Sequence, residues 1–139
     1  MKKIAQAAAL PFRKYRNKLQ ILIITSRSGK KWIIPKGIIE PGDSDRYTAL
    51  KEAQEEAGVS GKILKKEIGS YSYEKWDSLC EVKIYPLKVT EVYDEWDESS
   101  FRKRRWVGAK RAVRKVLPQG ASALIKEFIK SVESDLIEM

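Results

Sequence analysis

Three carboxylates stand close together in the chain, at Glu52, Glu55 and Glu56, near the end of the segment GIIEPGDSDRYTALKEAQEEAGV (37–59). Positions three and four apart share one face of a helix, so these side chains are expected to gather in one patch. Such a patch is locally unfavourable, because like charges repel and the end of a helix disfavours anions. A hard divalent cation would compensate, since Mg²⁺ prefers carboxylate oxygens. The spacing therefore predicts a cation site at a helix end.

The helix that must position these acids has recognisable ends. Ser44 is a good N-cap, Asp45 is favourable in the first turn, and Gly58 suits the position after the last turn. The acids are expected to face outward while the opposite side docks on the core. That apolar stripe is predicted to comprise Tyr47, Leu50, Ala53 and Ala57.

The composition excludes several kinds of chemistry. The chain has no histidine, which removes Ser-His-Asp and Cys-His catalysis and the usual zinc sites. Cys80 is the only cysteine, so no internal disulfide forms. Catalysis must therefore rely on carboxylates, lysine, tyrosine or a metal. The net charge of +9 favours an anionic partner, such as a phosphorylated small molecule, a nucleic acid or a membrane surface.

The remaining patterns predict a layered α+β domain covering residues 1–139. The run LQILIIT (19–25) is typical of a central strand that is buried on both faces. An acidic loop is expected at 93–100. No stretch is long enough to span a membrane, and we expect a cytoplasmic protein. The other strands are predicted at 3–12 (ending near Pro11), 32–34, 62–73, 79–93 and 105–107, and further helices at 109–117 and 121–137.

The segment 37–59 resembles the Nudix box, the signature of the Nudix hydrolase family, G-x5-E-x7-R-E-U-x-E-E-x-G-U with U a bulky aliphatic residue. Gly37 is followed by five residues and Asp43, and seven residues later by KEAQEEAGV (51–59), so every spacing matches. Asp43 and Lys51 stand where Glu and Arg are usual, and Ala53 is small for its position. The resemblance implies the family's α/β/α sandwich with a mixed β-sheet.

Segments outside the box are similar to the diphosphoinositol polyphosphate phosphohydrolase branch of that family, which also accepts diadenosine polyphosphates. They are WIIP (32–35), VTEV (89–92) with the acidic residues 94–98, and RKR (102–104) followed by Trp106. The reaction implied is hydrolysis of a phosphoanhydride bond in a nucleoside diphosphate-linked or polyphosphorylated small molecule.

The resemblance also implies roles for individual residues. Glu52, Glu55 and Glu56, with the backbone carbonyl of Lys36, are expected to bind Mg²⁺ or Mn²⁺ and to carry the catalysis. The general base is either Glu52 or an acid from residues 94–98. An Asp43–Lys51 pair is expected to support the metal-binding acids. The substrate phosphates are expected to contact basic side chains, namely Arg27, Lys31, Lys103 and Arg104.

Two alternatives remain at this stage. One is an RNA 5′-pyrophosphohydrolase, which the positive charge permits, although no RNA-binding module signature favours a nucleic-acid partner. The other is a catalytically weak Nudix module that senses a nucleotide. The pattern predicts no membrane partner, and either a monomer or a homodimer.

Overall fold

The computed structural model describes residues 1–134 and contains one eight-stranded mixed sheet. The main order of its strands is β3 (Trp32–Ile33), β2 (Lys18–Thr25), β1 (Lys2–Tyr15), β7 (Ser78–Val92) and β5 (Val59–Ile63). β4 (Lys36–Ile38) pairs with β1, β6 (Gly69–Lys75) with β7, and β8 (Arg104–Gly108) with β2. β1 and β7 are parallel, and the other pairs are antiparallel.

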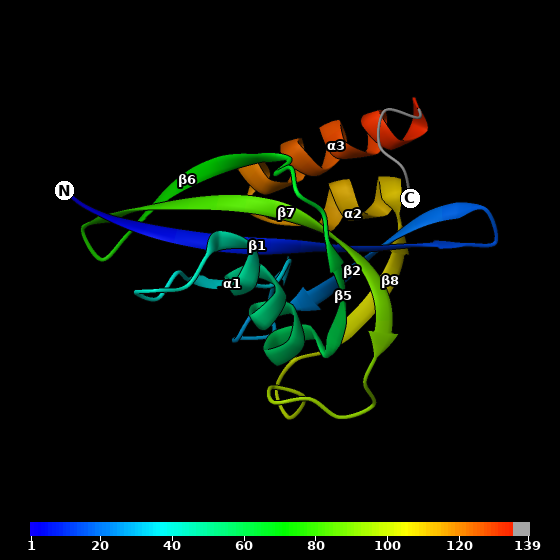
Figure 1. Cartoon of the computed structure of the whole chain (residues 1–139), viewed down its shortest axis with the longest axis horizontal. Helices are drawn as coiled ribbons and strands as arrows, with labels where there is room; N and C mark the ends of the chain where they lie inside the picture. The colour runs from blue at the N-terminus through cyan, green and yellow to red at the C-terminus, as the bar shows by residue number, and fades with distance from the viewer. Residues whose placement is uncertain (135–139) are drawn as a thin grey trace.

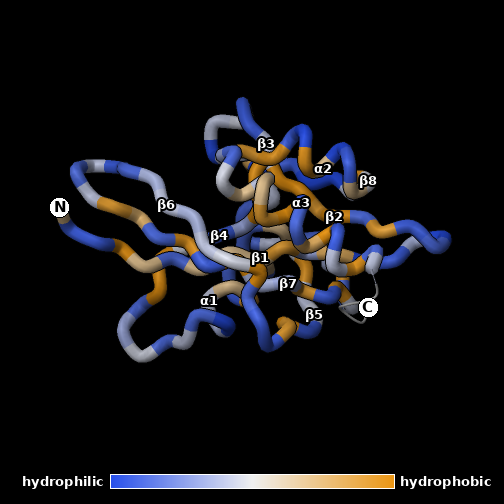
Figure 2. Tube along the Cα trace, turned by 90° about the horizontal axis from the view of Figure 1, so that it is seen from above, coloured by the Kyte–Doolittle hydropathy of each residue, from blue (hydrophilic) through white to orange (hydrophobic). Residues whose placement is uncertain are grey.

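Helices cover both faces of this sheet, and Figure 1 shows α1 (Asp45–Glu52) on one side of β1 and α2 (Ala109–Lys115) with α3 (Gln119–Glu133) on the other. The alternation of side chains along β1 produces two cores, because neighbours point to opposite faces. Ala7 and Ala9 pack with the α1 side, whereas Ala8 and Leu10 pack with the α3 side. The predicted α+β sandwich with a mixed sheet is thus confirmed, and its apolar strands lie in the middle of the molecule (Figure 2).

The helix that carries the box acids, residues 45–57 and called the box helix below, begins where the sequence predicts. The Ser44 hydroxyl accepts a hydrogen bond from the Tyr47 amide at 3.1 Å, and Gly58 ends the helix with a left-handed φ of 64°. Between them, however, α1 gives way to one π-helical turn, Ala53–Ala57. Single π turns inside helices are frequent at functional sites. Here the turn carries Glu55 and Glu56.

The predicted apolar stripe of this helix was partly wrong. Tyr47 is 54% exposed, and Ala49 is buried in its place, in line with Ala53 and Ala57. These three alanines lie against Ala7 and Ala9 of β1 in the same core. Small side chains on both elements allow the helix to approach the strand closely, which a tyrosine in the stripe would prevent.

The first strand was also predicted too short. β1 continues through Pro11 to Tyr15, because Pro11 lies between the pairing with β4, which ends at Ala8, and the pairing with β2, which begins at Phe12. Pro11 stays opposite Leu87 of β7 on the other edge of β1, and on this edge no neighbouring strand needs its amide hydrogen. The strand predicted at 62–73 is instead two strands, β5 and β6, and β4 was not predicted at all. The end predicted for the last helix, at residue 137, lies outside the described residues.

None of the helices formed by residues 1–134 has the length and apolar character needed to cross a bilayer.

Candidate active site

Glu56 is the most buried of the three box acids, which the sequence placed facing outward. Its residue is only 8% exposed. One carboxylate oxygen accepts a hydrogen bond from the Lys36 amide at 3.2 Å, and the other lies 3.5 Å from the Arg102 guanidinium. Burial raises the pKa of Glu56 to about 8, against the opposing effect of Arg102 and with a further contribution from Glu52. A buried carboxyl with this pKa holds a proton unless a cation takes the proton's place.

Glu52 lies beside Glu56 and shares its environment. The pKa of Glu52 is raised by burial and by the charge of Glu55, and these effects outweigh the lowering effect of the neighbouring Glu56 carboxyl. The backbone of Gly37 passes directly beneath the Glu52 carboxylate, so that a Cβ at Gly37 would stand 2.7 Å from its Oε1. Because Gly37 has no side chain, the Glu52 carboxylate can occupy this space.

We expect Gly37→Ala to fold and to lose metal-dependent turnover. The added methyl group must displace the Glu52 carboxylate, because contacts this short do not occur between real atoms. The apparent affinity for Mg²⁺, measured as the metal concentration for half-maximal turnover, should fall at least about tenfold, the equivalent of about 1.4 kcal/mol. Gly108→Ala is the matched control, since nothing lies within 4 Å of its Cβ position. Equal metal responses of the two variants would contradict the role given to Gly37.

Lys36 contributes its backbone to the site and directs its side chain elsewhere. Its amide donates to Glu56, while its Nζ donates to the Tyr73 hydroxyl at 2.9 Å, and that hydroxyl donates to Gln6 Oε1 at 2.8 Å. Asp43 and Lys51 form the expected ion pair at 3.7 Å. Because both of these side chains are partly exposed, the pair contributes at most about 1 kcal/mol to stability.

Arg102 is a residue of the site that the sequence did not single out. Its guanidinium is buried and makes three contacts, with Glu98 Oε1 at 2.8 Å, the Thr25 carbonyl at 2.9 Å and Glu56 at 3.5 Å. It thereby joins the acidic loop to the box helix and to β2. An acid of the loop was predicted as one candidate for the general base. Among these loop acids, Glu98 is the one whose charge contributes to raising the pKa of both Glu52 and Glu56.

The acidic loop is also fastened to the end of the box helix. The Trp96 indole donates to the Glu56 carbonyl at 3.0 Å, and the Glu98 amide donates to the Glu55 carbonyl at 3.1 Å. The Arg104 guanidinium donates to the carbonyls of Ala57 and Gly58, at 3.0 and 3.1 Å. A cation at these carbonyls complements the negative end of the helix. Arg104 thus has a structural contact that the sequence did not predict, and its phosphate-binding role stays a prediction.

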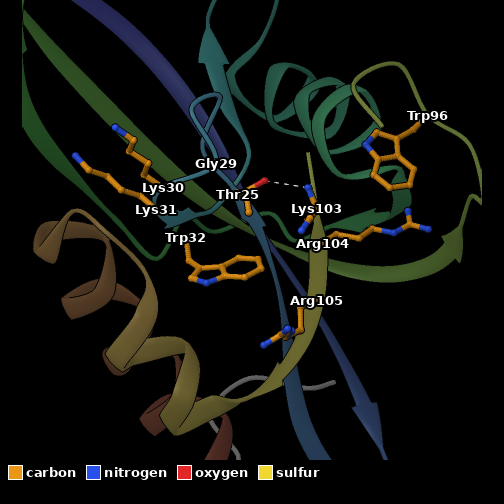
Figure 3. A pocket seen from close by; sticks show the side chains of 9 residues that line it. All are labelled: Thr25, Gly29, Lys30, Lys31, Trp32, Trp96, Lys103, Arg104 and Arg105. Carbon is orange, nitrogen blue, oxygen red and sulfur yellow. Dashed lines mark hydrogen bonds between the residues drawn. The ribbon is translucent and has the colours of Figure 1, made fainter. Parts of the chain in front are cut away.

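A pocket of about 520 Å³ opens next to this helix end (Figure 3). Its lining contains no carboxylate, and Thr25 connects it to the acids, because the Thr25 carbonyl accepts from Arg102. Three predicted phosphate-binding residues, Lys31, Lys103 and Arg104, line the pocket. The fourth, Arg27, lies over the Phe101 ring and does not. The lining residues are Thr25, Gly29, Lys30, Lys31, Trp32, Trp96, Lys103, Arg104 and Arg105.

The box acids have the chemistry of a divalent-cation site. Two neighbouring carboxyl groups whose pKa values are both raised form a donor pair that a hard cation would bind in place of protons. Within residues 1–134, no three acidic side chains are already close enough to form a complete set of metal ligands. The participation of Glu55 therefore remains a prediction, as does that of the Lys36 carbonyl.

Curated proteins with similar sequences include two named hydrolases. The chain is 35% identical over 111 residues to human diphosphoinositol polyphosphate phosphohydrolase 3-alpha, covering 78% of this chain and 66% of the relative. It is 29% identical over 127 residues to Nudix hydrolase 12, mitochondrial, of Arabidopsis thaliana, covering 86% and 63%. The chain spans about half to two thirds of the length of the curated relatives it matches.

A solved structure shares the fold. The C. elegans Ap4A hydrolase superposes with a TM-score of 0.76 at 22% identity, over 95% of this chain and 99% of that one. The family model described as NUDIX domain matches residues 5–129, which include the box, the acidic loop and most of the sheet. This chain therefore belongs to the Nudix hydrolase family.

Proposed function

We propose that this chain is a divalent-metal-dependent hydrolase of a phosphoanhydride bond in a polyphosphorylated small molecule, of the diadenosine polyphosphate or diphosphoinositol polyphosphate type. One observation carries the proposal: a pair of carboxyl groups, of which Glu56 is buried and Glu52 partly buried, lies beside a pocket lined by five cationic side chains and no acid. Such a lining favours a substrate with several phosphates. The names of the relatives, a diphosphoinositol polyphosphate phosphohydrolase and an Ap4A hydrolase, point to the same class.

The residues of the site would have two roles, metal binding and proton removal. Glu52, Glu55 and Glu56, with the Lys36 carbonyl, would hold Mg²⁺ or Mn²⁺, and a bound divalent cation would neutralise phosphate charge and lower the pKa of an attacking water. Glu52 and Glu98 are the candidate bases. Glu52 has a raised pKa, which brings a carboxylate closer to the value that suits proton removal near neutral pH. Arg102 fixes the Glu98 side chain beside the box acids.

Aromatic side chains in the pocket favour a nucleotide at one end of the substrate. Trp32 and Trp96 both belong to the lining, and an adenine ring stacks on such surfaces. Lys30, Lys31 and Lys103 would then contact the phosphate chain. A diphosphoinositol polyphosphate would use the same cations and would gain little from the aromatic rings.

A turnover screen tests the proposed function. Diadenosine polyphosphates, diphosphoinositol phosphates, nucleoside diphosphate sugars and nucleoside triphosphates are compared with Mg²⁺, with Mn²⁺ and with a chelator. We expect metal-dependent cleavage that is fastest for a diadenosine polyphosphate. Nucleotide binding without any metal-dependent release of product would overturn the proposal in favour of a sensing module.

Lys103→Ala should raise KM about tenfold and change kcat less. The Lys103 side chain is exposed at the pocket, and its backbone amide is held by the Thr25 hydroxyl at 2.9 Å, so the substitution removes a charge without disturbing the strand. An interaction made equally in the ground state and the transition state affects KM rather than kcat. Steady-state kinetics with the best substrate provide the measurement. Lys65→Ala, an exposed lysine between β5 and β6, is the matched control, and an equal KM in both variants would assign Lys103 to the solvated surface.

A further inference from the structure

The charge of this chain is distributed unevenly along the sequence. Residues 1–39 and 99–126 together contain 19 of the 28 lysines and arginines and no aspartate or glutamate. The antiparallel pairing of β2 with β8 brings these two segments side by side, from Gln20 opposite Gly108 to Ile24 opposite Arg104. The fold therefore places basic residues of both segments around the paired strands β2 and β8, and this basic region extends beyond the pocket.

The outer end of this basic region is the hairpin end, defined as residues 13–18, where β1 turns into β2. Figures 1 and 2 both show it projecting from the body of the molecule. Lys14, Arg16 and Lys18 are exposed. Among residues 1–134, the only cations of the two basic segments that form ion pairs are Lys3 and Arg102, neither of which belongs to the hairpin end. Its charge is therefore not neutralised by the described part of the protein.

Guanidinium groups and aromatic rings alternate on one face of the hairpin end and the neighbouring β8. The Arg13 guanidinium lies 4.0 Å from the centre of the Trp106 ring and 4.9 Å from that of Tyr15, and Arg16 lies 5.2 Å from Tyr15. Gln20 accepts a hydrogen bond from Arg13 Nε at 2.9 Å. This stacking orders the arginine side chains in the free protein, so less conformational entropy is lost when a ligand binds.

We propose that the hairpin end, together with Trp106, binds a single-stranded nucleic acid. Uncompensated cations attract its phosphates, and arginine planes and aromatic rings stack on its bases. None of the residues of the hairpin end lines the pocket, so the basic surface is not confined to the pocket that a small phosphorylated molecule would occupy. A lipid surface fits less well, because Tyr15 is the only large exposed side chain with apolar character at the hairpin end.

Fluorescence anisotropy with a labelled 20-nucleotide single-stranded RNA that carries a 5′-hydroxyl tests the proposal. This probe has no phosphoanhydride bond, so the result does not depend on hydrolysis. Arg13→Gln/Arg16→Gln should weaken binding at least about tenfold at 0.1 M salt and reduce the slope of log K against log salt by about 1.4, the loss of two phosphate contacts. Tyr15→Ala should weaken binding about fivefold or more through lost stacking.

Matched variants in the β5–β6 connection and the β6–β7 turn separate this site from the effect of net charge. Lys65→Gln/Lys66→Gln removes two exposed charges outside the basic segments, and Trp76→Ala removes a ring that is 81% exposed at the β6–β7 turn. Both should bind RNA like the parent protein. Lys14→Gln/Lys18→Gln repeats the charge test without touching the stacked arginines, should Arg13→Gln/Arg16→Gln unfold. Equal weakening by control and hairpin variants would overturn the proposal. Binding to phosphatidylserine vesicles but not to RNA would overturn it as well.

Discussion

Glu56→Gln is expected to lower kcat by at least about two orders of magnitude and to leave the fold intact. The loss of one negative ligand at a phosphoryl-transfer site removes several kcal/mol of transition-state stabilisation, and each 1.4 kcal/mol is about tenfold in rate. Glutamine keeps nearly the same volume and an oxygen that can accept from the Lys36 amide, which Glu56 does at 3.2 Å. Metal-dependent turnover of the best substrate provides the measurement, and near-parental turnover would contradict the assignment of the box acids.

Thermal unfolding separates loss of chemistry from loss of structure in this variant. Because burial raises the pKa of Glu56 from 4.5 to about 8, its contribution to stability is present in full below pH 4.5 and is lost as the pH rises through about 8. The amide does not titrate and escapes that loss. In chelator at pH 8, Glu56→Gln should therefore be at least as stable as the parent protein. Glu127→Gln, an exposed acid on α3, is the activity control.

Arg102→Met is expected to lower the free energy of unfolding by about 3 kcal/mol, the usual cost of breaking a buried ion pair by removing one partner. The substitution leaves the buried arginine's three acceptors without their donor: Glu98 at 2.8 Å, the Thr25 carbonyl at 2.9 Å and Glu56 at 3.5 Å. The same change should reduce kcat, because the acidic loop loses its link to the box acids. Urea denaturation and steady-state kinetics measure the two effects.

Arg105→Met provides the comparison three positions later in the chain, in β8. Arg105 is exposed and forms no ion pair among residues 1–134, so its replacement should change stability by no more than about 0.5 kcal/mol. Arg102→Lys adds a further test, since a lysine keeps the charge but cannot contact three acceptors with one planar group. If Arg102→Met and Arg105→Met were equally stable, the stabilising role of the Arg102 contacts with Glu98, Thr25 and Glu56 would be refuted.

The parts of the site that depend on neighbouring residues were predictable from the sequence. Ser44 and Gly58 mark the two ends of the box helix through local capping, which acts over three or four positions. The acids between them follow from helical spacing. The nearly continuous apolar run LQILIIT predicted a strand buried on both faces, and Ile21, Leu22, Ile23 and Ile24 are all buried.

The parts that depend on distant residues were not predictable in this way. Glu56 is buried because Arg102 and the Lys36 amide compensate it, and these partners lie 46 and 20 positions away. Nothing in the local pattern distinguishes Arg102 from its basic neighbours, since only the fold turns its side chain inward. The continuation of β1 through Pro11 likewise depends on which strands pair at each position, and β4 has too few residues to show a pattern of its own.

The parallel pairing of β1 with β7 has a consequence for how the protein folds. Every residue pair in that ladder, from Lys2 with Ser78 to Phe12 with Lys88, joins positions 76 apart. Contacts of this range are slow to form, because a long loop must close before any of them is made. The box helix precedes β7 in the chain, so its alanines can dock on β1 before β1 has its parallel partner. The box acids therefore acquire their final geometry late, and until β7 pairs with it the apolar strand β1 has an open edge that other chains can pair with.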